Sequence, residues 1–218
     1  MKECLVALGF ALITNYSFAA SQTSFEDTAY LRVVTQRAAK IVAVLELPDS
    51  STFFQVRDIV AGQYLALNTI YNDRDMAIKA AKERAGADKS GLDTAKKMIG
   101  EDVDKRVARL HGQYLGSLAK KLNSKQIEQV KDGMTYGVLP ITYRAYQEML
   151  PDLSAEQKAR ILSDLTEARE HAMDAESSEK KHAWFGKYKG RINNYLSAAG
   201  IDMKKAGEEW AKRRQAGG

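Results

Sequence analysis

The sequence has a single cysteine, Cys4, and only three prolines among 218 residues. Cys4 lies inside the first apolar run, so the rest of the chain contains no cysteine at all. This absence excludes a disulfide framework, a thiolate metal site and a cysteine nucleophile outside that run. Because proline is the residue that most strongly interrupts helices, its scarcity also favours long helices.

Motifs for common catalytic and cofactor chemistry are missing as well. The chain contains no G-x-S-x-G motif, no phosphate-cradling loop and no dinucleotide fingerprint. His111, His171 and His182 fit no zinc-protease spacing, and Glu179–His182 is one E-x-x-H unit where di-iron bundles use two. We therefore predict no metal site and no cofactor.

Asp73, Asp75, Glu101 and Asp174 are candidates for the pair of carboxylates that glycoside hydrolysis requires. Any helical protein with this many acids allows such pairs, so they carry no signal by themselves. The sequence leaves enzymatic activity open and favours a protein that is not an enzyme.

The start of the chain resembles a secretory signal peptide. Met1 and Lys2 precede an apolar run from Cys4 to Ile13, and Ser17-Phe18-Ala19 forms a small-residue exit. We expect residues 1–19 to be a leader cleaved near Ala19 and the mature protein to be periplasmic or secreted. Later apolar runs are too short to cross a membrane, so no membrane span is predicted.

The net charge of +5 comes from basic residues that are interspersed with acids along the chain. A mixed pattern of this kind indicates a solvated surface, and an exported chain is a poor candidate for contact with nucleic acid. We therefore do not expect nucleic acid as a partner. The residues indicate no oligomeric state.

The apolar periodicity is helical almost everywhere, and no segment alternates as a strand does. Leu31, Val34, Ala38 and Ile41, for example, recur every three or four residues. We predict an all-α fold, a single-domain helical bundle with short connections over residues 25–216. The expected helices cover about 25–47, 52–85, 92–118, 124–133, 141–149, 155–175 and 180–199, and a last one begins at Asp202.

Two helix starts share a pattern. Asn123 and Ser154 each precede a glutamine by three residues, Gln126 and Gln157, which predicts a capping box in both places. The same Leu-x-x-x-Gln starts are similar to the L-T-x-x-Q motif of small periplasmic helical chaperones. A capping box explains the match without a shared function.

The densest group of aromatic, amide and basic residues lies between Lys180 and Asp202. At helical spacing one face carries Trp184, Lys187, Tyr188, Arg191 and Tyr195, and a second carries Phe185, Ile192, Leu196 and Ala199. Gly186 and Gly190 lie between these faces, and each costs a helix about 1 kcal/mol relative to alanine. Close approach of another backbone or of a ligand would offset that cost.

This composition suits a sugar site, which combines an aromatic surface with converging polar groups. The candidate ligand-binding residues are Trp184, Lys187, Tyr188, Arg191, Asn193 and Asn194, with Asn68, Asn72, Asp73 and Arg74 near Tyr71 as a second source and Tyr136 and Tyr143 as a third. The structural alternatives are that Trp184 and Tyr188 belong to the core, that Asn193 bonds to nearby backbone and that residues 72–74 form a solvated face. We expect Trp184, Tyr188 and Arg191 to line one pocket with part of residues 68–74.

Two runs carry a family resemblance: KDGMTYGVLPITYRAYQEMLPDLSAEQKARIL (131–162) and AREHAMDAESSEKKHAWFGKYKGRINNYLSAAGID (168–202). They are similar to the exported family called domain of unknown function 3826, most specifically in HAWFGKYKGRINNYLSAAG. The resemblance implies an all-helical fold, export and a carbohydrate-related setting with a sugar-binding label. It implies no catalytic residues.

The function that these observations favour is that of a carbohydrate-associated binding or accessory protein in polysaccharide use, with an oligosaccharide or polysaccharide as partner. The alternatives are a periplasmic helical chaperone or stress protein, and a hydrolase or lyase that acts on polysaccharide.

Overall fold

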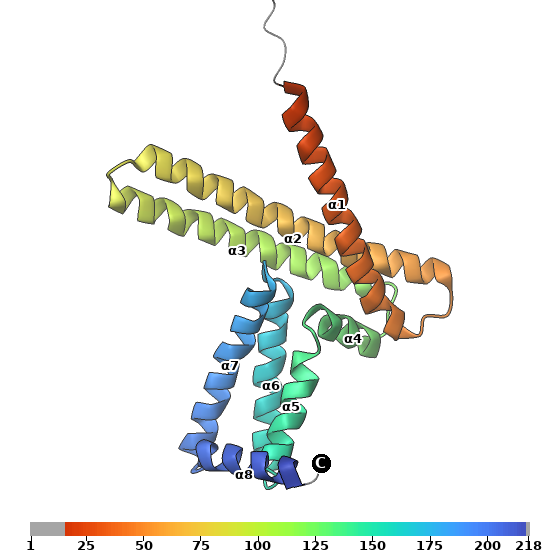
Figure 1. The fold of residues 1–218 in the computed structure, drawn as a ribbon, viewed down its shortest axis with the longest axis vertical. Coiled ribbons are helices and arrows are strands. Elements are labelled where there is room, and N and C mark those ends of the chain that lie inside the picture. The colour runs from red at the N-terminus through yellow and green to blue at the C-terminus, as the bar shows by residue number, and fades with distance from the viewer. Residues whose placement is uncertain (1–15, 217–218) are drawn as a thin grey trace, which may run out of the picture.

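The protein is all-α, as the sequence predicts. The computed structural model describes residues 16–216, with side chains from Thr28 onward, and this part of the chain contains helices and no strands (Figure 1). The elements are α1 (Tyr16–Val42), η1 (Ala43–Leu45), α2 (Ser50–Ala85), α3 (Lys89–Ala119), α4 (Ser124–Met134), α5 (Val138–Met149), α6 (Ala155–Met173), α7 (Ser178–Ala198) and α8 (Met203–Ala216). Residues 1–15 of the expected leader lie outside the described residues, so cleavage near Ala19 stays a prediction.

Three helices begin at least three residues before their predicted starts. The first helix extends back from Phe25 to Tyr16, in a stretch that contains neither proline nor glycine. The third begins at Lys89 because Asp88 caps it by accepting a hydrogen bond from the Gly91 N–H at 3.0 Å. α5 begins at Val138 because Pro140 lies in its first turn, where proline is tolerated.

The two predicted capping boxes are both present. The side chains of Asn123 and Ser154 accept from the backbone N–H of Gln126 and Gln157, at 2.9 and 3.1 Å, and each glutamine accepts in return from the cap N–H. Gln126 also donates to the Leu45 carbonyl at 3.1 Å, which ties the start of α4 to the end of η1. Local capping therefore accounts for both glutamines of the Leu-x-x-x-Gln pattern.

Helices α1 to α4 form one cluster, which we call the hairpin cluster. α2 and α3 are a long antiparallel pair joined through Gly86, and α1 crosses α2 (Figure 1). Its core contains Val34 and Ala38 of α1 with Val56 and Val60 of α2, all fully buried. Gly133 lets α4 come close to α1, because an added Cβ would lie 2.9 Å from the Ile41 side chain.

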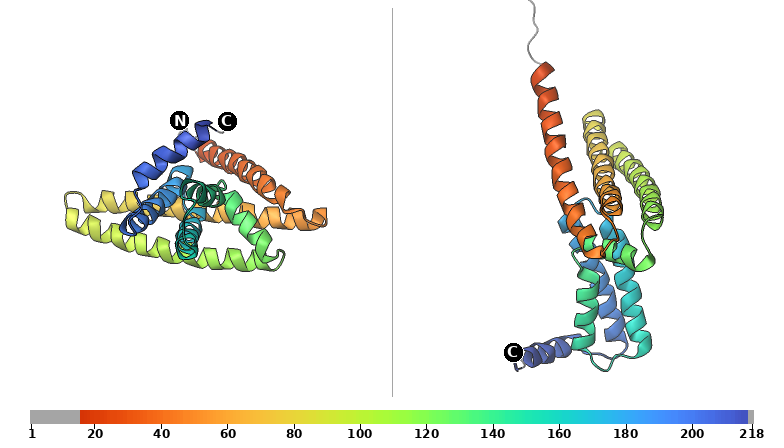
Figure 2. Two further views of the ribbon diagram at one scale, coloured as in Figure 1. Left: turned by 90° about the horizontal axis from the view of Figure 1, so that it is seen from below. Right: turned by 90° about the vertical axis from the view of Figure 1, so that its right-hand side faces the viewer.

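Helices α5 to α8 form a second cluster, the bundle cluster, with a hydrophobic core of its own. α5, α6 and α7 extend away from the hairpin, and α8 crosses their far end (Figures 1 and 2). Ile161, Leu165, Phe185 and Ile192 are buried at its centre. No helix in the described part of the chain carries an apolar stretch sufficient to span a bilayer.

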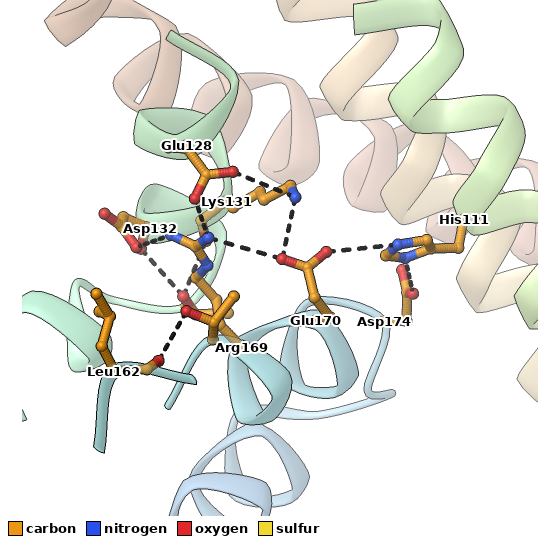
Figure 3. Close-up of polar contacts among 10 residues, drawn as sticks. His111, Glu128, Lys131, Asp132, Leu162, Arg169, Glu170 and Asp174 are labelled. Atoms are coloured by element: carbon orange, nitrogen blue, oxygen red, sulfur yellow. Dashed lines mark hydrogen bonds and ion pairs between the residues drawn. The ribbon is translucent and has the colours of Figure 1, made fainter. Parts of the chain in front are cut away.

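A polar junction joins the two clusters. Arg169 of α6, only 2% exposed, forms ion pairs with Glu128 and with Asp132 of α4, the latter at 2.7 Å. Lys131 of α4 bonds to Glu170 of α6 at 3.0 Å (Figure 3). These contacts fix the orientation of α6 against the hairpin cluster, and with it the walls of the cleft described next.

Candidate functional site

A cleft of about 710 Å³ lies where the α2–α3 hairpin meets the C-terminal end of α6 and the N-terminal part of α7. Four helices contribute to it, so the cleft depends on the junction between the two clusters. Its aromatic and polar lining comes from Tyr71, Arg74, Asp104, His111, Glu170, His171, Asp174 and Trp184. This volume falls in the range of ligand pockets.

His111 lies between two carboxylates in this cleft. Its Nδ1 is 2.6 Å from Asp174 Oδ2, and its Nε2 is 3.5 Å from Glu170 Oε2 (Figure 3). The hydrogen bond to Asp174, followed by the one to Glu170, raises the pKa of His111 to about 9. The imidazole is therefore protonated at neutral pH and donates from both nitrogens.

The surrounding groups hold both carboxylates in place. Burial alone would raise the pKa of Glu170, but hydrogen bonds from His111 and Lys131 outweigh it and lower the pKa to about 2. Asp174 accepts from Gln63 at 3.0 Å, and its backbone carbonyl accepts from the Tyr71 hydroxyl at 2.8 Å. Glu170 is thus ionised at neutral pH, and the network is preorganised by contacts from α2, α3 and α4.

Trp184 supplies the aromatic surface of the cleft. The indole is half-buried, and the exposed imidazole of His171 stacks on it with ring centroids 4.3 Å apart and planes 14° apart. The Lys187 ammonium lies 4.9 Å from the ring centroid. Trp184 and Tyr71, predicted from separate segments, therefore line the same cleft.

Tyr188 and Arg191 do not line the cleft, contrary to the predicted grouping. Tyr188 is 4% exposed and packs in the bundle core, because it lies three residues after Phe185 on the buried stripe of α7. Arg191 is exposed on α7 and pairs with Asp164 at 3.3 Å and with Glu167 at 3.2 Å. The predicted apolar face that begins at Phe185 ends at Leu196, because Ala199 is exposed.

The other predicted residues are distributed over several surfaces. Arg74 lines the cleft and pairs with Asp75 and Glu176, while Asp73 bonds to Arg106 of α3 at 2.6 Å. Asn193 accepts a hydrogen bond at 2.7 Å from the Tyr146 hydroxyl in a separate cavity under α8. The remaining amides do not line the cleft: Asn68 is half-buried, and Asn72 and Asn194 are exposed.

No described part of the chain comes close to Gly186 or Gly190. A Cβ added at either position would meet no atom within 4 Å. Of the two approaches that would offset the cost of these glycines, another backbone is not found among the described residues, which leaves a ligand or a second molecule.

Sequence reasoning missed His111, Glu170 and Asp174 as one group. Glu170 lies in the last turn of α6 and Asp174 is the C-cap of that helix, but His111 precedes Asp174 by 63 residues on another helix. The only local signal was the pair of acids at i and i+4 beside His171. Within residues 16–216 no cluster of three or more His, Cys, Asp or Glu has metal-binding geometry.

One family model matches the chain. It covers residues 31–216, nearly all of both clusters, and its description is protein of unknown function, DUF3826. The chain belongs to the DUF3826 family. No curated protein matches the sequence. Because the DUF3826 match includes all four helices of the cleft, the site lies entirely within the part of the chain that defines the family.

Proposed function

We propose that this DUF3826 protein binds a saccharide in the cleft between the hairpin and bundle clusters. The observation that carries the proposal is that the half-buried indole of Trp184 lines one cavity together with the hydrogen-bonded network of His111, Glu170 and Asp174. An aromatic ring takes the C–H face of a sugar, and fixed polar groups take its hydroxyls. The part of the indole that His171 and Lys187 leave exposed is the platform.

The charges of the cleft favour a neutral or amino sugar over a uronate. Arg74 is already paired with Asp75 and Glu176, and both nitrogens of His111 face carboxylates. Asp104 is exposed and forms no ion pair with any described residue, so the unbalanced charge in the cleft is negative. A second anion would be repelled there.

The test is isothermal titration of residues 20–218 with neutral, amino and uronic oligosaccharides taken from a glycan array. We expect Trp184→Ala to weaken binding at least tenfold, because stacking on an aromatic ring supplies about 1 kcal/mol or more beyond the area buried. Trp210→Ala is the matched control, since the other tryptophan lines a different cavity. If no oligosaccharide binds, or if both variants bind as the parent does, the proposal is wrong.

A second candidate is cleavage of a polysaccharide, which rests on His111 alone. A histidine whose pKa is near 9 can donate a proton but is already too protonated at pH 7 to accept one. Such a group would serve as a general acid once a substrate oxygen replaces Glu170 at Nε2, the longer of the two contacts of His111 at 3.5 Å. Incubation with polysaccharide should then release reducing ends, and His111→Asn should abolish the release. Binding without release in the parent protein would leave saccharide binding as the function.

A further inference from the structure

A second cavity of about 320 Å³ lies between α5, α7 and α8, at the end of the bundle cluster. It shares no lining residue with the cleft. Its outer wall is α8, which lies across the far end of the bundle and has no buried residue of its own (Figure 1). The apolar contacts of α8 with the bundle core come from partly buried residues such as Met203.

Polar contacts occur at both ends of α8: the first set caps the start of the helix, and the second ties its other end to α5. The Asp202 carboxylate accepts from the backbone N–H groups of Lys204 and Lys205 at 3.1 and 3.0 Å. Near the other end, Arg213 donates to the carbonyls of Glu148 and Met149 at 3.0 and 3.1 Å, where α5 terminates. The middle of α8 thus spans the cavity without filling it, and Ile141 on the α5 side stays 55% exposed.

The two sides of the cavity differ in chemistry. Met203 and Trp210 of α8 form an apolar wall with Met149. On α7, Asn193 uses its amide oxygen to accept from the Tyr146 hydroxyl at 2.7 Å, so the amide N–H groups remain as donors. The ammonium of Lys189, one turn away, forms no ion pair with any described residue, and no acid lines the cavity.

We propose that this cavity binds a small amphipathic carboxylate. The carboxylate lies on the Lys189 ammonium and the Asn193 amide, and the apolar body lies against Met203 and Trp210. Charge-assisted hydrogen bonds are about twice as strong as neutral ones, so donors without a neighbouring acid select an anion over a neutral ligand of equal shape. The site is independent of saccharide binding in the cleft.

The test compares 3-phenylpropanoate with its neutral counterpart 3-phenylpropan-1-ol. In a Trp184→Phe protein, Trp210 is the sole tryptophan and reports occupancy by its fluorescence. We expect saturable quenching by the carboxylate with an affinity about tenfold higher than for the alcohol. Lys189→Gln should remove this difference, while the matched control Lys187→Gln, on the same helix but outside the cavity, should preserve it.

Equal affinity for acid and alcohol would overturn the proposal, and so would the absence of saturable quenching at millimolar concentrations. An equal loss in Lys187→Gln would also overturn it, because general surface charge would then explain binding. Far-UV circular dichroism checks that each variant folds. If Lys189→Gln is misfolded, Asn193→Ala is the second probe, and an unchanged preference for the acid in it would contradict the proposed contacts.

Discussion

At the scale of single residues, the most informative group is His111. It is the one histidine whose two nitrogens both face carboxylates, and its protonation stabilises the contact between α3 and α6. Asp174 is only 7% exposed, and its side chain accepts from the Gln63 amide and contacts the His111 imidazole. The cleft is therefore built from groups that stabilise one another's charge.

The pH dependence of folding should report this contact. The pKa of His111 is raised from 6.5 to about 9 in the folded state, so its stabilisation is complete below pH 6.5 and is lost as the pH rises through 9. We expect urea unfolding of the parent protein to lose about 2 kcal/mol over this window relative to His111→Asn, the net value of a charge-assisted hydrogen bond.

Comparison with the variant is needed because Lys181 acts in the opposite sense. Burial lowers the pKa of Lys181 to about 8, so its contribution to stability rises as the pH increases from 8 towards 10.5. The exposed His182, which stacks on Tyr136, is the matched control: His182→Asn should retain the parental pH profile. A parental profile in His111→Asn would contradict the assignment.

The helical glycines give a second test at residue scale. Gly186 and Gly190 have open space where a Cβ would lie, so alanine at both should stabilise the protein by about 1 kcal/mol or more. Gly133→Ala should instead destabilise it by about 1–3 kcal/mol, because the new methyl would overlap the Ile41 side chain at 2.9 Å. Thermal unfolding monitored by circular dichroism measures both, and a destabilised Gly186→Ala/Gly190→Ala double variant would show that the exposed face of α7 is constrained.

At the scale of elements, the α2–α3 hairpin divides into two parts. Towards its base, α1 and α4 cover it and bury a continuous apolar seam. From residue 73 to residue 106, which includes the far turn, only Ala81 and Val103 are buried. Because packing of an apolar face supplies most of the stability of a helix, the distal half should open more readily.

Hydrogen exchange should resolve this difference along one helix. We expect amides of residues 77–84 to exchange about tenfold or more faster than amides of residues 56–67, although both segments belong to α2. Mass spectrometry of peptic fragments provides the measurement at neutral pH. Equal protection along α2 would mean that something other than the described contacts stabilises the distal half.

At the scale of the whole molecule, the buried Arg169 couples the two clusters. Burial by itself would lower its pKa, but hydrogen bonds to Asp132 and Glu128 outweigh that effect and keep the guanidinium charged. Its Nε–H has no partner among the described residues, so the ion pairs leave one buried donor without a hydrogen bond. The junction therefore combines these ion pairs with one apolar contact, since the fully buried Met173 of α6 belongs to the core of the hairpin cluster.

Removing this cation should destabilise the protein markedly. Arg169→Met removes the cation shared by Glu128, Asp132 and Glu170. Lys131 still pairs with Glu128 and Glu170, but Asp132 loses its partner, and we expect a loss of about 3 kcal/mol in urea unfolding. The matched control is Arg144→Met, which removes an exposed pair with Glu148 and should change stability by less than about 1 kcal/mol. Similar losses in both variants would contradict the role of the junction.

The sequence by itself determined the helical fold and most of the points at which helices begin and end. Two kinds of pattern depend only on neighbours within about four positions: the apolar periodicity of residues such as Val34 and Ala38, and the capping boxes at Asn123 and Ser154. Both can therefore be recognised from the sequence alone. The start of α5 was missed because Pro140 fits inside a first turn as well as outside one. Local patterns therefore gave the elements and most of their ends.

Only the tertiary structure decided which predicted residues meet. Trp184 and Tyr71 share a cleft, whereas Tyr188, four residues beyond Trp184, turns into the core and Asn193 belongs to another cavity. His111 and Asp174 are neighbours only because α6 docks against the hairpin through Arg169. Contacts between helices depend on how the two clusters pack, and no spacing within a single helix encodes that packing.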